Sequence, residues 1–155
     1  SRYMNDMALP EKPNAGFFRR NIKELIFQLK KQTNAKIAIL SLPPIGEEIK
    51  HIAWQRTKEY SDIIQGIAEA DNIDYLPLHE NITEYLLAED HHPRLSYDNG
   101  FRRIMIKGIF SHFLLGSSFD KIATKNGFLI VTDFLHLNHR GAKMVADLIK
   151  NWLLK

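Results

Sequence analysis

Residues 128–138 read F-L-I-V-T-D-F-L-H-L-N, and this stretch decides how the end of the chain is interpreted. It opens with a short apolar run typical of a buried strand, and the sequence after Asn138 has the apolar spacing of an amphipathic helix. Asp133 and His136 lie between the two, three residues apart. A histidine in such a place can take a proton from a weak nucleophile, and a nearby carboxylate can fix its tautomer and stabilise the imidazolium.

Strand-like and helix-like segments alternate along the rest of the chain. Asn14 and Asn138 are typical residues for capping the start of a helix. The alternation indicates an α/β fold with a mostly parallel sheet, whose functional sites form at the carboxyl ends of the strands. No linker or repeat divides the chain, so residues 1–155 are expected to form a single domain. We expect strands over residues 36–42, 73–78 and 128–131, helices over residues 15–32, 49–70, 81–87 and 101–115, a short helix capped by Ser117, and a final helix whose buried stripe is Ala142, Val145, Leu148, Ile149, Trp152 and Leu153.

The composition excludes several classes of function. The 155 residues are 45% hydrophobic and 25% charged, which is ordinary for a globular domain. The net charge of +3 comes from scattered basic pairs without interleaved aromatics, which disfavours nucleic-acid binding. Without cysteine there is no disulfide, thiolate metal site or cysteine nucleophile. No apolar run is long enough to span a bilayer.

Two short motifs carry a resemblance to a known family. The C-terminal D-x-x-H-L-N strongly resembles the last conserved block of the SGNH hydrolases, also called GDSL esterases and lipases. Residues 3–6, Y-M-N-D, resemble the G-x-N-D block of that family, with Tyr3 in place of the glycine. The resemblance implies a flavodoxin-like three-layer α/β/α fold. It also implies that His136 is the general base, that Asp133 orients it, and that Asn5 donates to the oxyanion hole.

The resemblance extends over the chain but matches only the later part of the family's domain. The family's first block, a G-D-S motif that carries the nucleophilic serine, is absent from the sequence. We therefore expect an N-terminally incomplete SGNH domain that lacks its first strands. The nucleophilic serine is expected outside this chain, and the chain alone is expected to be inactive.

The function implied is hydrolysis of a small-molecule or lipid ester through a Ser-His-Asp triad, with no cofactor or metal. The expected partners are an upstream polypeptide segment that carries the serine, or a second copy bound through an exposed sheet edge. One alternative is a catalytically silent binding or interaction module derived from an SGNH domain. Another is an unrelated doubly wound domain in which the D-x-x-H spacing is accidental.

The remaining polar candidates have simpler interpretations. His136 and His139 form an H-x-x-H pair, but no third ligand has suitable spacing, so no metal is expected. His91 and His92 lie in a polar loop and are expected to be solvated. Residues 101–119 are strongly apolar, which favours core packing; an acyl-chain wall or lid, and more weakly a membrane contact, are the alternatives. The serines are expected to be structural or solvent-facing: Ser1, Ser41, Ser61, Ser96, Ser111, Ser117 and Ser118.

Overall fold

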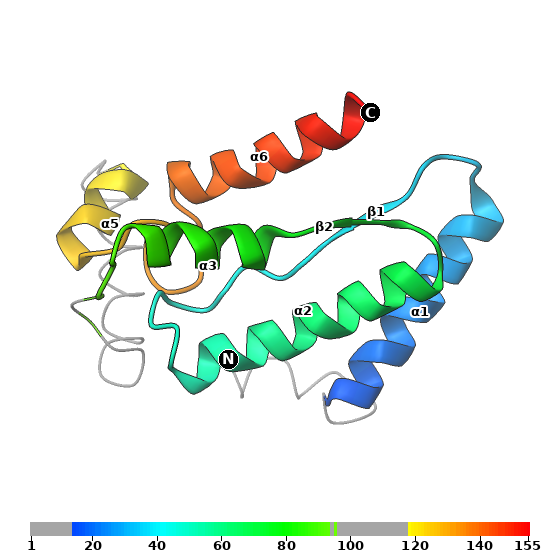
Figure 1. The fold of residues 1–155 in the computed structure, drawn as a ribbon, viewed down its shortest axis with the longest axis horizontal. Helices are drawn as coiled ribbons and strands as arrows, with labels where there is room; N and C mark the ends of the chain where they lie inside the picture. Colours follow the sequence, from blue (N-terminus) through cyan, green and yellow to red (C-terminus); the bar gives the residue numbers. More distant parts are fainter. Residues whose placement is uncertain (1–13, 94, 96–117) are drawn as a thin grey trace.

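The computed structural model describes residues 14–93, 95 and 118–155, and these form an α/β arrangement (Figure 1). β1 and β2 pair in parallel, with Ala38 opposite Asp74 and Leu40 opposite Leu76. A parallel pair needs a long crossover, and α2 provides it. The predicted α/β class is therefore confirmed. The elements in chain order are α1 (Ala15–Gln32), β1 (Ala38–Leu40), α2 (Ile52–Ala70), β2 (Asp74–Leu76), α3 (Leu78–Ala88), α5 (Phe119–Asn126) and α6 (His139–Leu153).

Helices cover both sides of the strand pair. In Figure 1, α1 and α2 lie on one side of the strands and α6 lies on the other. Phe18 of α1 meets Tyr60 of α2 edge to face, with ring centroids 4.7 Å apart. At the other side, the indole N–H of Trp152 donates to Asp74 at the start of β2. The layers are those of part of a flavodoxin-like fold.

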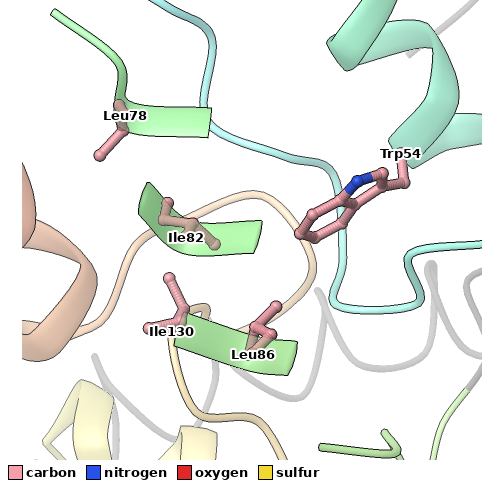
Figure 2. Close-up of a cluster of buried hydrophobic side chains, with 5 residues drawn as sticks. All are labelled: Trp54, Leu78, Ile82, Leu86 and Ile130. Atoms are coloured by element: carbon pink, nitrogen blue, oxygen red, sulfur yellow. The ribbon is translucent and has the colours of Figure 1, made fainter. Parts of the chain in front are cut away.

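A buried apolar cluster fixes the C-terminal segment against α3 (Figure 2). Leu78, Ile82 and Leu86 lie on successive turns of α3, Trp54 reaches in from α2, and Ile130 comes from the segment before the D-x-x-H motif. Each of these side chains is at most 1% exposed. Burying a side chain of this size stabilises the fold by about 1.5–3 kcal/mol. The segment that carries Asp133 and His136 is thus anchored in the core.

The ends of the helices follow the sequence closely. The side chain of Asn14 caps α1 and that of Asn138 caps α6, as predicted. Ser118 caps α5, one residue beyond the predicted cap. α2 starts three residues later than predicted because His51 caps it, with Nδ1 accepting from the N–H of Ala53 at 3.1 Å.

The strand predicted over residues 128–131 is wrong. In its place Val131 makes one isolated antiparallel bridge with Leu137. The backbone N–H groups of residues 129–131 donate to the carboxylate of Glu47 and not to a neighbouring strand. The segment is apolar because it is buried, but its hydrogen bonds are not those of a sheet.

Part of the predicted stripe on α6 is also wrong. Val145 and Leu148 pack against the core, but Ala142, Ile149 and Leu153 are exposed. The sheet of the described residues has two strands, which are too narrow to cover the full apolar face of this helix. Within the described ranges, no helix is both long and apolar enough to cross a membrane. Asn5, Ser117 and the predicted helix over residues 101–115 lie outside the described residues.

Candidate active site

Asp133 and His136 form a hydrogen-bonded pair in the loop between residue 131 and α6. The Nδ1 atom of His136 lies 2.9 Å from each carboxylate oxygen of Asp133. The side chain of Asp133 is 6% exposed, whereas that of His136 is 65% exposed. An ionised carboxylate only accepts hydrogen bonds, so in the neutral form of the ring the proton lies on Nδ1 and Nε2 keeps its lone pair. In that tautomer the pair presents the Nε2 lone pair on an exposed side chain, with a buried carboxylate behind it.

The carboxylate of Asp133 is itself held by the backbone. Its Oδ1 accepts from the N–H of His136 at 3.0 Å and from the N–H of Leu135 at 3.3 Å. The N–H of Thr132 donates to the carbonyl of His136 at 2.7 Å and closes the loop. Hydrogen bonds to an ionised acceptor are stronger than neutral ones. The backbone of the loop thus fixes the position of the Asp133 carboxylate, and the carboxylate in turn orients the imidazole of His136.

Phe134 gives this loop an unusual backbone. Its φ is 80°, in the left-handed region that side chains with a Cβ rarely adopt. The ring is buried and packs edge to face on Phe128 at 4.8 Å. The backbone carbonyl of Phe134 accepts from the N–H of Gly46 at 2.7 Å. Gly46 also has a positive φ, and a Cβ there would lie 3.2 Å from the Phe134 ring. The positive φ of Phe134 persists because packing and this hydrogen bond hold it.

Glu47 is the residue next to the site that sequence reasoning missed. Its side chain is fully buried, and His91 Nε2 lies 2.6 Å from its Oε2. His91 was expected to be solvated, and that prediction is wrong, because its side chain is only 11% exposed against this carboxylate. His92 is 88% exposed, as expected. The available signal was the position of Glu47 shortly after the carboxyl end of a predicted strand. Its neighbour Glu48 made that signal ambiguous.

The serines in the described part of the chain have structural roles, as predicted. Ser41 is buried, donates to Glu80 at 3.1 Å and accepts from the N–H of His79 at 2.8 Å. Ser61 is buried and donates within α2 to a backbone carbonyl. Ser118 caps α5. A nucleophile must reach substrate, so the buried Ser41 and Ser61 are unsuitable. The serines outside the described residues are Ser1, Ser96, Ser111 and Ser117.

His79 is a buried histidine with a structural role. Its Nδ1 lies 3.2 Å from the carbonyl oxygen of Leu42, and its ring packs on Trp54. Burial lowers the pKa of His79, which favours the neutral ring in the folded protein. Burial, followed by the hydrogen bond to Glu80, raises the pKa of Tyr75 well above its usual value. This network ties β1 and β2 to the start of α3.

No metal centre is found in the described residues: no group of three or more His, Asp or Glu side chains there is arranged to hold an ion. His139 begins α6, and its N–H donates to Asp120 at 3.0 Å. A surface hollow of about 510 Å³ lies at the amino ends of β1 and β2, lined in part by Lys30 and Lys36. Gly46 and Glu47, which contact the loop of the site, follow the carboxyl end of β1, so this hollow is separate from the site.

Comparison with known proteins supports the fold through structure alone. No protein-family model matches the chain, and no curated protein matches it with significance. One similar solved structure is an acetyl xylan esterase, with a TM-score of 0.60 and 21% identity over 89% of this chain and 55% of that chain. Another is an alpha/beta hydrolase enzyme from the metagenome of Lake Arreo, Spain, with a TM-score of 0.57 and 11% identity over 92% of this chain and 49% of that chain.

The chain spans about half the length of these two enzymes. At these identities the likeness concerns the fold alone. Both neighbours are hydrolytic enzymes by name, and their likeness in fold agrees with the α/β arrangement predicted from the sequence.

Proposed function

We propose that this chain supplies the histidine and the aspartate of a Ser-His-Asp triad in a carboxylic-ester hydrolase of the SGNH or GDSL type. The observation that carries the proposal is the hydrogen bond between the buried, backbone-anchored carboxylate of Asp133 and the Nδ1 of the exposed His136. Its support is chemical: this arrangement directs the ring's free lone pair, on Nε2, away from the carboxylate. The likeness of the fold to those of two hydrolytic enzymes is consistent with this proposal.

The proposed reaction has two halves. His136 Nε2 accepts the proton of a serine hydroxyl as the serine oxygen attacks the ester carbonyl, and it then donates that proton to the leaving alcohol. In the second half His136 takes a proton from water as the water oxygen attacks the acyl-enzyme, and it donates that proton to the serine oxygen as the acid is released. Asp133 stabilises the imidazolium in both halves. Asn5, by resemblance, donates to the oxyanion, a contribution of about 3–4 kcal/mol in comparable enzymes.

The serine nucleophile is proposed to come from outside this chain. Ser41, Ser61 and Ser118 are engaged in hydrogen bonds that hold the fold. From the sequence, the source is an upstream polypeptide segment. One structural neighbour is named for its action on acetyl xylan, so acetyl esters of carbohydrates are the first substrates to test, beside small-molecule and lipid esters.

The test is hydrolysis of p-nitrophenyl acetate by the intact protein that contains this chain. His136→Ala is expected to lower kcat by at least ~10³-fold, because members of a triad act as a unit. His92→Ala is the matched control, since His92 is exposed in a neighbouring loop and pairs only weakly with Asp90 at 3.5 Å. Wild-type kcat in His136→Ala would contradict the proposal. An intact protein without any esterase activity would favour the silent binding module.

A further inference from the structure

The segment before the Asp133 loop is held by a single buried carboxylate far away in sequence. Glu47 Oε1 accepts from the N–H groups of Leu129, Ile130 and Val131, at 2.9, 2.6 and 2.9 Å. The N–H of Leu129 also lies 2.9 Å from Oε2. In an extended strand, successive N–H groups point to opposite sides. Three consecutive N–H groups that converge on one oxygen therefore form an anion-binding concavity.

This concavity is connected directly to the site. Val131 is two residues before Asp133, and Phe134, one residue after it, accepts the hydrogen bond from Gly46. Two consecutive residues, Gly46 and Glu47, thus bind the chain on both sides of Asp133. We propose that Glu47 is a positioning residue for the Asp133–His136 pair. This inference rests on the proposed function of that pair.

A charged acceptor suits this role better than a neutral one. A buried carboxylate is stable only where several donors compensate its charge, and Glu47 has three backbone donors and the nearby His91 ring. The charge strengthens each hydrogen bond from residues 129–131 to Glu47. It also attracts the ring of His91, which follows α3. The φ of 80° at Phe134 needs such external support, since an isolated loop would relax it.

The test compares Glu47→Gln and Glu47→Ala with Glu80→Gln in the intact protein. Glu80 is a matched control because it is a partly buried carboxylate that binds Ser41 and Tyr75 and makes no hydrogen bond to the Asp133 loop. The first measurement is proton NMR of the His136 Nδ1–H, assigned by its loss in His136→Gln. The second is amide hydrogen exchange at residues 129–131. The third is kcat and KM on p-nitrophenyl acetate.

We expect a graded response at Glu47. In Glu47→Ala the Nδ1–H signal broadens or disappears, exchange at residues 129–131 accelerates, and kcat falls by about 100-fold with KM almost unchanged, because the base is misplaced while substrate contacts persist. Glu47→Gln gives smaller changes of the same kind, since its carbonyl oxygen can still accept. Glu80→Gln lowers the melting temperature but leaves the His136 signal and kcat at wild-type values.

Two results would overturn the inference. One is a wild-type His136 signal and wild-type kcat in folded Glu47 variants. The other is a loss of kcat in Glu80→Gln equal to that in Glu47→Gln at the same loss of melting temperature. If Glu47→Ala does not fold, Glu47→Gln decides by the same criteria. Failure of the proposed function looks different: activity would be insensitive to His136→Ala, while the Glu47 variants would still alter the His136 signal.

Discussion

Replacing Asp133 with asparagine separates orientation of the imidazole from stability of the loop. Oδ1 accepts from two backbone N–H groups and, like Oδ2, lies 2.9 Å from His136 Nδ1. An asparagine keeps these bonds with its own oxygen and places its NH₂ group where Oδ2 lies, 2.9 Å from His136 Nδ1. The amide then donates to Nδ1, and the ring proton moves to Nε2. The base is lost although the loop keeps its hydrogen bonds.

The expected loss in kcat is about 10⁴-fold, the effect of the same change in a well-studied serine protease. At 1.36 kcal/mol for each factor of ten, this is about 5.4 kcal/mol on the barrier. The free energy of unfolding should fall by only about 1.5–3 kcal/mol, because a neutral amide replaces an ionised carboxylate while the loop keeps its backbone hydrogen bonds.

The assay is hydrolysis of p-nitrophenyl acetate by the intact protein, beside thermal unfolding monitored by circular dichroism. Asp120→Asn is the control, since Asp120 accepts a backbone N–H at the start of α6. It should leave kcat unchanged. A kcat in folded Asp133→Asn within tenfold of the wild type would refute the reasoning.

Three further predictions concern stability. His79 has a lowered pKa in the folded state, so the unfolded state binds more protons near pH 6.5. The free energy of unfolding therefore falls as the pH drops below that value. In urea titrations, the difference in unfolding free energy between the wild type and His79→Gln should shrink from pH 7 to pH 5. Ile130→Ala should lower the free energy of unfolding by about 2–5 kcal/mol in the same titration, because Ile130 is fully buried. A loss below about 1 kcal/mol would contradict the packing in Figure 2. Gly141→Ala should lower the free energy of unfolding by about 1–3 kcal/mol, since the new Cβ would lie 2.7 Å from the backbone oxygen of Ile130. An unchanged melting temperature would show that this close approach is absent.

The sequence predicted the parts of the fold that depend on local patterns. α1 has the predicted bounds, and Asn14 and Asn138 cap their helices, because amphipathic spacing and side-chain caps act within a few residues. The Asp133–His136 hydrogen bond was also predictable, since both residues share one short loop. The roles of these two residues and of Asn5 in catalysis stay predictions.

The failures have a common physical cause in contacts between distant residues. An apolar run such as residues 128–131 is typical of a strand, but Glu47, more than eighty residues earlier, accepts its N–H groups. The same carboxylate draws His91 out of solvent. Ile149 and Leu153 are exposed because the two-stranded sheet of the described residues is too narrow to cover them. The periodicity of a helix predicts its apolar face, but it does not predict the width of the sheet against which that face packs.

The most direct measurement of the central claim is labelling of the intact protein with a fluorophosphonate probe, followed by mass spectrometry of the modified peptide. The probe reacts with a serine only when a neighbouring base activates it. We predict one labelled serine in an upstream segment, outside residues 1–155, with labelling abolished by His136→Ala and unaffected by His92→Ala. Label on any serine within residues 1–155, or wild-type labelling in His136→Ala, would contradict this prediction.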